Sequence, residues 1–289
     1  MFIKKDKYGV GTGRLRKLRV LSAIIVGCCV LFINTAGVAA NGSVNAESEK
    51  KPEPIAEGEV SAALLAEVGT GRVVYEYNSE EKLPAAGLTR LAALVSVCKG
   101  FDEGRLKPGD AVSVSEKAAG IGGTTAFLKA GEQMDAETML LAAVMINAGD
   151  ATHSLALAAA GSESAAVQEV NACMAGIGVE TNFSEICGAG EKLSASELAK
   201  IGAALTASES YRKFGTKFYE KIEHNTGAGA TELANPNKLV KQYSGCIGVG
   251  TGSSTEAGYC GVFAAKRGNT AFIAVVLGAK TSGTRFDCG

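Results

Sequence analysis

The stretch YCGVFAAKRGNTAFIAVVL, residues 259–277, decides the fold class, because it holds two apolar runs on either side of a short polar turn. The runs are residues 259–265 and 270–277, and the turn is Lys-Arg-Gly-Asn at residues 266–269. This pattern is typical of a β-hairpin. Residues 246–251 form a further candidate strand just upstream. The C-terminal part therefore predicts neighbouring antiparallel strands.

The beginning of the folded part shows the same pattern. Residues 60–68 and 72–77 are apolar-rich runs, and Gly69-Thr70-Gly71 separates them. Glycine readily adopts the positive φ that tight hairpin turns need, so these residues predict a second hairpin.

The middle of the chain has the pattern of helices instead. Residues 136–146 follow Asp135, a helix-capping residue, and Ser194 with Glu197 makes a capping box that opens another helix. Strands at both ends with helices between them predict an α+β domain, in which the terminal strands share one antiparallel sheet flanked by helices and the middle forms a helical subdomain. Two more helices are expected at residues 151–160 and 164–177.

The N-terminal 40 residues have the features of an export signal. Seven basic residues and one acidic residue lie within residues 1–19, and an apolar run follows at residues 20–33. The short side chains of Val38 and Ala40 fit the cleavage site of a signal peptidase. We expect a signal peptide at residues 1–40, a polar linker at residues 41–58 and a folded domain at residues 59–289.

Two alternatives to this cleavage stay open. The apolar run could be an uncleaved anchor, or a lipoprotein cut could occur before Cys28. Both are less favoured, because the run is short for a membrane span and the lipoprotein cut would leave apolar residues directly beyond the lipid. In every case we expect export to the outer face of the cell envelope or into the medium, with membrane contact only through the N-terminal segment.

Composition and charge exclude several classes of protein. The chain has 289 residues, 46% of them hydrophobic, which is enough for the core of one large domain. The net charge is −1, and residues 1–19 contribute +6, so the remainder carries −7. An acidic remainder argues against nucleic acid as a partner, because phosphates need a concentrated basic face.

Cysteines and histidines give no sign of a metal site or a cofactor. Six cysteines lie beyond the N-terminal segment, and none has the Cys-x-x-Cys spacing of a zinc site. We expect them to be buried or disulfide-bonded, since export permits disulfides. His153 and His224 lie far apart without ligand residues nearby in the sequence, so we expect exposed or hydrogen-bonded structural histidines.

Several strings then occur in an order that is typical of one family. From about residue 60 to residue 287 the chain resembles the low-molecular-mass penicillin-binding proteins that are serine D-alanyl-D-alanine carboxypeptidases. The resemblance implies a β-lactamase/transpeptidase-like fold. The matching strings are VGTGRVVYEYN (68–78), LPAA (83–86), GGTTAFLKAGE (122–132), NPNKL (235–239), TEAGYC (255–260) and AVVLGA (274–279).

The family's nucleophile motif is a serine with a lysine three residues later. The two side chains then lie on one helix face, where a neutral lysine can take the hydroxyl proton. The corresponding residues here are Gly87-Leu88-Thr89-Arg90. Glycine has no nucleophile, and a guanidinium cannot act as a base near neutral pH. The resemblance therefore implies that nucleophile and base are both replaced.

The family's other two motifs are altered as well. Its Ser-x-Asn motif aligns with Asn147-Ala148-Gly149, so the relay hydroxyl is absent and only one amide side chain is present. Its Lys-Thr-Gly motif aligns with Gly250-Thr251-Gly252, so the strand lysine is absent. We expect Thr251, Gly252 and Ser253 to line the substrate groove, with the amides of Gly87 and Ser253 forming a residual oxyanion hole.

These replacements favour a non-catalytic carboxypeptidase homologue that binds peptidoglycan stem peptides or an envelope protein. The alternative is an active hydrolase of the same class, with Thr89, Thr124 or Thr125 as a new nucleophile. A third, structural interpretation is that Arg90 fills the space of the family's lysine and pairs with an acidic neighbour.

Overall fold

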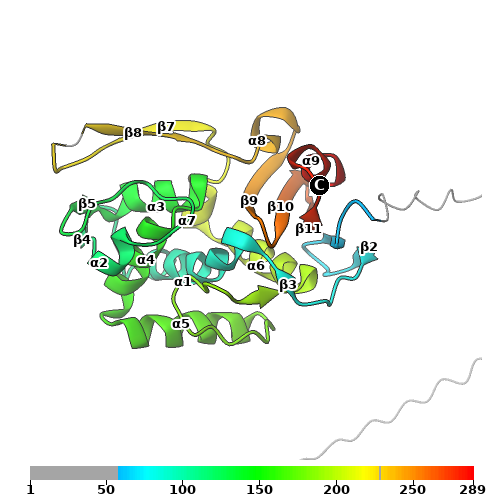
Figure 1. The fold of residues 1–289 in the computed structure, drawn as a ribbon, viewed down its shortest axis with the longest axis horizontal. Helices are drawn as coiled ribbons and strands as arrows, with labels where there is room; N and C mark the ends of the chain where they lie inside the picture. Colours follow the sequence, from blue (N-terminus) through cyan, green and yellow to red (C-terminus); the bar gives the residue numbers. More distant parts are fainter. Residues whose placement is uncertain (1–57, 228) are drawn as a thin grey trace, which may run out of the picture. The chain divides into compact units, whose positions relative to one another are not determined.

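Strands from both ends of the chain form one five-stranded antiparallel sheet, which confirms the predicted α+β class (Figure 1). The computed structural model describes residues 58–227 and 229–289. In it the sheet order is β2-β1-β11-β10-β9, and β1 pairs with β11 so that Ala62 lies opposite Leu277. The five strands are β1 (Ala62–Glu67), β2 (Val73–Tyr77), β9 (Cys246–Ser254), β10 (Gly258–Arg267) and β11 (Thr270–Ala279).

Helices fill the middle of the chain, as the sequence predicts. Asp135 caps α3, because its Oδ1 accepts a hydrogen bond of 2.8 Å from the Thr138 amide. The capping box of Ser194 and Glu197 opens α6. The helices are η1 (Ala86–Thr89), α1 (Arg90–Asp102), α2 (Glu116–Ala119), α3 (Ala136–Ile146), α4 (Gly149–Ala160), α5 (Glu163–Gly176), α6 (Ala195–Ala207), α7 (Glu209–Arg212), α8 (Leu239–Gln242) and α9 (Ser282–Cys288).

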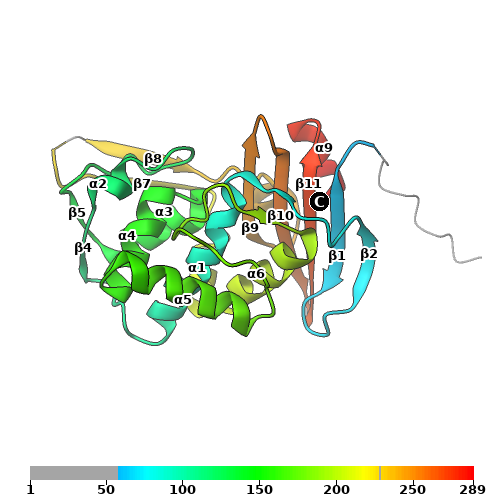
Figure 2. The same ribbon diagram turned by 60° about the horizontal axis from the view of Figure 1, so that its bottom comes forward.

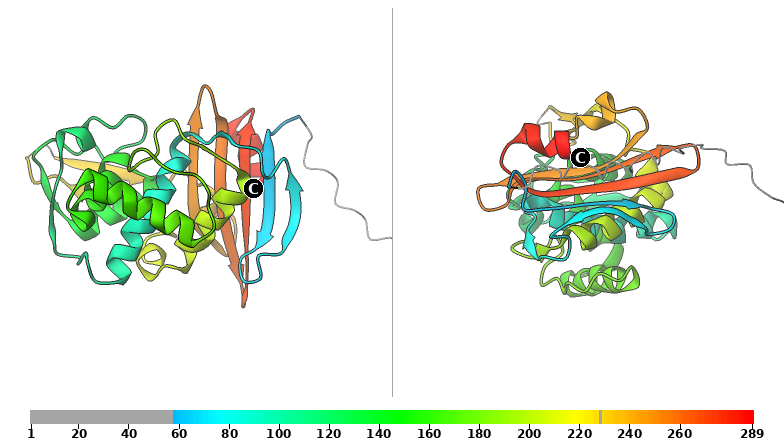
Figure 3. Two further views of the ribbon diagram at one scale, coloured as in Figure 1. Left: turned by 90° about the horizontal axis from the view of Figure 1, so that it is seen from below. Right: turned by 90° about the vertical axis from the view of Figure 1, so that its right-hand side faces the viewer.

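The sheet lies between two layers of helix, and α1 crosses the centre of the domain. Helix α6 contacts β9, β10, β11 and β1, while α9 packs on β10 and β11 from the other face (Figure 3). Strand β9 is the edge strand nearest to the helical part, and β2 is the far edge (Figure 2). The edge of the sheet thus faces the beginning of α1.

Three short strand pairs complete the described part. The third pair is a hairpin that extends from the β9 side over α3 (Figure 1). The pairs are β3 (Leu83–Pro84) with β6 (Lys192–Leu193), β4 (Ala111–Ser113) with β5 (Gln133–Asp135), and β7 (Tyr219–Glu223) with β8 (Ala230–Ala234).

The predicted signal peptide or anchor, residues 1–40, lies outside the described residues, as does almost all of the predicted linker, residues 41–58. Within residues 58–227 and 229–289, no helix has both the length and the apolar character needed to cross a membrane.

The six cysteines of the described part are all unbridged, and five of them are buried, so of the two expected states, buried or disulfide-bonded, the structure shows burial. Only Cys288 is partly exposed. Burial raises the pKa of Cys98 and of Cys187 to about 12, so both thiols stay protonated and unreactive near neutral pH.

Candidate ligand groove

The three predicted motif segments meet at one hollow of about 330 Å³. Helix η1 supplies one wall, the end of α3 a second, and the end of β9 a third. Among the predicted site residues, Gly149 and Gly250 do not line the hollow. The lining residues are Ala86, Gly87, Arg90, Gly123, Thr124, Asn147, Pro236, Thr251, Gly252, Ser253, Ser254 and Arg285.

Gly87 leaves open space where the family has its nucleophile. A Cβ atom at this position would lie 3.7 Å from Asn147 Nδ2 and 4.0 Å from Arg90 Nη1, which are ordinary contact distances. The Asn147 amide donates a hydrogen bond of 2.6 Å to the Gly87 carbonyl. The position is therefore held in place by its neighbours but carries no reactive group.

Arg90 spans the hollow and binds backbone carbonyls. Its guanidinium donates to the carbonyl of Gly122, to that of Thr124 at 2.9 Å and to that of Asn147 at 3.4 Å. The expectation of an acidic partner for Arg90 is wrong, because no carboxylate within the described ranges forms an ion pair with it. A planar guanidinium has several donors, so carbonyl groups from a loop and a helix end can replace a carboxylate.

Gly149 is explained by the position of Arg90. A Cβ atom at Gly149 would lie 2.9 Å from Arg90 Cζ and 2.7 Å from Ile121 Cγ2, both closer than real Cβ contacts. The guanidinium thus occupies space that a side chain at position 149 would need. Arg90, at the position of the family's lysine, and Gly149, at the position of the family's asparagine, are thus complementary in size.

Asn147 ends α3 in the left-handed conformation, with φ 56° and ψ 45°, which asparagine tolerates better than most residues. Its Nδ2 donates to the Gly87 carbonyl, but its Oδ1 is buried and has no hydrogen-bond partner among the described residues. Because buried acceptors are normally satisfied, this oxygen is a candidate acceptor for a ligand N–H group.

Strand β9 approaches η1 closely at Gly252. A Cβ atom there would lie 3.1 Å from the Gly87 amide nitrogen and 3.3 Å from that of Leu88, so glycine permits this contact. Thr251 is nearly buried beside it, and Ser253 is exposed. Since β9 is an edge strand, an extended peptide has access to its outer side.

Arg285 is a functional candidate that the sequence analysis missed. It lies on α9 and is only 7% exposed, and its Nη1 donates to the carbonyls of Gly252 (3.2 Å) and Cys260 (3.3 Å). Its Nε is buried without a hydrogen-bond partner, and no carboxylate of the described part pairs with it. Burial lowers the pKa of the guanidinium, as expected for a cation without a counterion. No motif spacing in the sequence indicates a role for Arg285, because this residue lies on a separate C-terminal helix.

The hydroxyl groups proposed as new nucleophiles do not share one site. Thr89 is buried and donates to the Cys187 carbonyl at 3.0 Å. Thr124 lines the groove, while Thr125 lines a neighbouring hollow. The lining of the groove, within the part of the chain that is described, contains no histidine, lysine or carboxylate. A hydroxyl in this hollow therefore has no such group among the other residues that line it, and the neighbouring hollow, which Thr124 and Thr125 both line, contains one carboxylate, that of Glu232.

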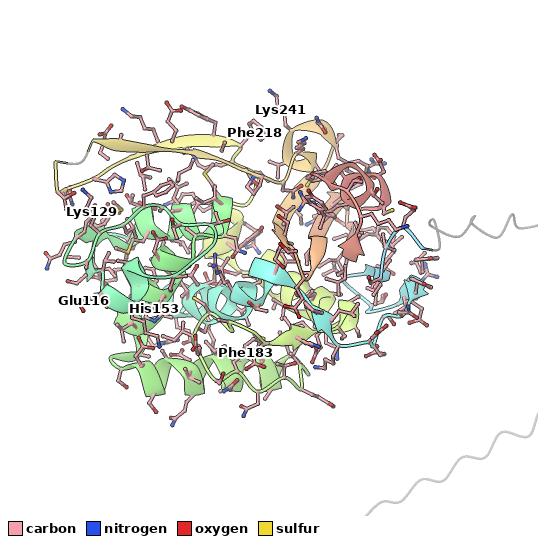
Figure 4. All side chains as sticks on the ribbon, in the orientation of Figure 1. Glu116, Lys129, His153, Phe183, Phe218 and Lys241 are labelled. Carbon is pink, nitrogen blue, oxygen red and sulfur yellow. The ribbon has the colours of Figure 1, made fainter. Side chains whose placement is uncertain are left out.

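The two histidines lie far apart and differ in their surroundings. His224 Nδ1 lies 2.9 Å from Glu132 Oε1, and its Nε2 lies 2.8 Å from Thr231 Oγ1, so it is hydrogen-bonded as expected. For His153 on α4 (Figure 4) the expectation is wrong, because the side chain is buried and neither ring nitrogen has a hydrogen-bond partner among the described residues, although Nε2 lies 2.9 Å from Glu163 Oε1. Burial lowers the pKa of His153, so the imidazole is neutral near pH 7.

A larger hollow of about 610 Å³ lies between α1, α3 and α7, but its polar groups already satisfy one another. Lys213 pairs there with Glu137, and Ser210 Oγ donates to Asp102 Oδ1 at 2.6 Å. The groove between η1 and β9 contains two buried polar atoms without a hydrogen-bond partner, Asn147 Oδ1 and Arg285 Nε, and all three predicted motif segments meet there, so it is the candidate functional site.

Comparison with known proteins agrees with this architecture. The chain belongs to the D-alanyl-D-alanine carboxypeptidase family, whose profile matches residues 46–281. D-alanyl-D-alanine carboxypeptidase DacF of Bacillus subtilis (strain 168) is 33% identical over 267 residues, which cover 91% of this chain and 67% of the relative. The chain thus spans about two thirds of the length of that protein.

Two solved structures show the same fold. The D-alanyl-D-alanine carboxypeptidase DacD from Francisella tularensis superposes with a TM-score of 0.71 at 22% identity, covering 80% of this chain and 68% of that one. A C98N mutant of the Streptomyces K15 DD-transpeptidase gives a TM-score of 0.69 at 22% identity, covering 79% and 94%. The predicted β-lactamase/transpeptidase-like fold is confirmed.

Proposed function

We propose that this protein binds peptidoglycan stem peptides ending in D-alanyl-D-alanine and does not cleave them. The observation that carries the proposal is the composition of the groove. The described residues that line it include a buried Arg285 without an acidic partner and the end of the edge strand β9, but they include neither a nucleophile at position 87 nor a histidine, lysine or carboxylate.

The recognition of such a peptide rests on charge and on backbone pairing. A terminal carboxylate beside Arg285 would supply the counterion that the guanidinium lacks, and charge-assisted hydrogen bonds of this kind are among the strongest in proteins. The peptide backbone would pair with β9 in the manner of an added strand. The unpaired Asn147 Oδ1 offers an acceptor for a peptide amide. Gly250 stands where the family has its strand lysine, and in this proposal Arg285 supplies the cation that the lysine would have supplied.

The absence of cleavage rests on the positions of Gly87 and Arg90. Acyl transfer needs a nucleophile beside a group that accepts its proton. Gly87 provides no hydroxyl, and the Arg90 guanidinium has only donors, which it directs at backbone carbonyls, so it offers no acceptor for a proton. The amides of Gly87 and Ser253 both border the hollow, so a carbonyl group could be held there without being attacked.

The place of action follows from the same proposal. The family acts on cell-wall peptides, and the N-terminal 40 residues have the pattern of an export signal. We therefore place the protein in the cell envelope, or outside the cell, with stem peptides as its partner and no nucleic acid.

Isothermal titration of the domain with Nα,Nε-diacetyl-L-Lys-D-Ala-D-Ala tests the proposal. Heat of binding with unchanged peptide after long incubation is the expected result. The same peptide with a C-terminal amide is the matched control, and it should bind at least about tenfold more weakly because it offers no carboxylate to Arg285.

Three results would count against this function. Equal binding of acid and amide would remove the role of Arg285. Release of D-alanine would restore the hydrolase alternative. Absence of binding, together with a crosslinked envelope protein, would favour a protein partner.

A further inference from the structure

The groove continues past Arg90 into a second hollow of about 360 Å³. The two hollows share Gly123, Thr124 and Pro236, so they form one continuous surface depression. The first hollow contains the guanidiniums of Arg90 and Arg285. The second is lined by both polar and apolar side chains, and its lining residues are Gly123, Thr124, Thr125, Phe127, Ile146, Thr231, Glu232, Ala234 and Pro236.

Phe127 is the unusual residue of the second hollow. It is 72% exposed, the most exposed large hydrophobic residue of the described part. Its backbone has φ 60°, a left-handed conformation that is unfavourable for a residue with a Cβ atom. Neither the exposure of the ring nor the strained backbone stabilises the fold. A role in binding is therefore the better explanation for both features.

Asp150 holds this conformation in place. Its buried carboxylate accepts hydrogen bonds from the Ala126 amide at 2.9 Å and from the Leu128 amide at 3.0 Å, on either side of Phe127. Because both flanking amides are fixed, the intervening side chain is directed out of the loop. The loop thus presents the ring without a folding transition on binding.

The opposite wall of the second hollow is also preformed. The hairpin β7–β8 is attached to the loop at its far end by His224, which lies between Glu132 and Thr231. At its near end Lys241 Nζ lies 5.2 Å from the centre of the Phe218 ring (Figure 4). A wall and a loop backbone that are both held by hydrogen bonds reduce the entropic cost of binding a ligand.

We propose that the second hollow is a subsite for the part of the stem peptide upstream of D-alanyl-D-alanine, with an aliphatic side chain of that part packed on Phe127. This inference rests on the proposed function, which fixes the carboxylate beside Arg285. An extended chain anchored there leaves the first hollow over Thr124 and Pro236, since these residues join the two hollows. Phe127 is the large exposed apolar side chain among the described residues that line this hollow, so we assign the main apolar contact to it.

The experiment compares two peptides on the wild-type domain and on variants. The long peptide is L-Ala-γ-D-Glu-L-Lys-D-Ala-D-Ala, and the short one is acetyl-D-Ala-D-Ala. Wild type should bind the long peptide at least about tenfold more tightly, since one buried aliphatic side chain is worth roughly that factor. Phe127→Ala should lose most of this difference and leave the short peptide unaffected. Phe127→Leu should retain it.

Tyr243→Ala is the matched control, because Tyr243 is an exposed aromatic residue (47%) that lines neither hollow. It should change neither affinity. If wild type binds both peptides equally, or if Phe127→Ala keeps the full difference, the subsite is refuted while the proposed function stands. If wild type binds neither peptide, both proposals fail.

Discussion

Arg90 and Gly149 should be energetically coupled, because the guanidinium fills the space that a side chain at position 149 would need. The Cβ atom of Gly149→Ala would meet Arg90 Cζ at 2.9 Å and Ile121 Cγ2 at 2.7 Å. Overpacking of this kind typically costs about 1–3 kcal/mol. The substitution also lowers the backbone entropy of the unfolded chain, which offsets up to about 1 kcal/mol. We expect a net loss of about 1–2 kcal/mol for the single variant.

Arg90→Ala should itself cost about 2 kcal/mol, because three carbonyl groups lose a charged donor. In that background Gly149→Ala retains only the contact with Ile121, so its cost should fall by about half. The expected coupling free energy is therefore about 1 kcal/mol, with the double variant more stable than the sum of the singles predicts.

Urea denaturation followed by circular dichroism measures the free energy of unfolding of all four proteins. Gly176→Ala is the matched control, because this helical glycine has no atom within 4 Å of its virtual Cβ and should show no coupling with Arg90→Ala. A coupling below about 0.3 kcal/mol at Gly149 would mean that Arg90 does not occupy the space, and the steric account would be wrong.

Two further predictions concern stability. Burial alone would raise the pKa of the Glu197 carboxyl, but hydrogen bonds from Lys82 and the Ser194 amide outweigh it and hold the pKa below its usual value. The stabilisation is therefore present above about pH 4.3, the unfolded pKa, and is lost as pH falls through the folded pKa. The Tm difference between wild type and Glu197→Gln should shrink over that pH window. A difference in Tm that stays constant over the window would contradict this. Asp150→Ala should lower the free energy of unfolding by at least about 3 kcal/mol, since it leaves buried amides unpaired. Asp135→Ala, at an exposed helix cap, should lower it by about 1 kcal/mol. Comparable losses for the two variants in urea titrations would refute the assigned roles.

The fold could be predicted from local sequence patterns to within a few residues. The C-terminal hairpin was expected at residues 259–265 and 270–277, and its strands extend to Gly258–Arg267 and Thr270–Ala279 because the ladder continues into the polar turn. The strand expected at residues 246–251 continues to Ser254, since pairing with β10 compensates for its poor apolar pattern. Helix α3 has the predicted bounds, because Asp135 caps it and a left-handed Asn147 ends it.

The groove could be predicted only in part. Gly87, Arg90, Asn147 and Thr251 were found because motif positions follow the chain order of the family. Arg285 was missed because its approach to Gly252 depends on how α9 packs on the sheet, which no local pattern reports. The prediction of an acidic partner for Arg90 was wrong for a related reason. Its partners are backbone carbonyls, and the sequence does not indicate which carbonyls the fold brings near a side chain.

Intact-mass analysis of the domain after incubation with a fluorescent penicillin tests the central claim most directly. Penicillins acylate a competent nucleophile of this family, so the adduct reports the chemistry itself. We predict no mass increase for the folded wild-type domain, with folding verified by its melting transition, while it still binds the diacetylated tripeptide. A stoichiometric adduct would contradict the account and show that the groove retains an active nucleophile.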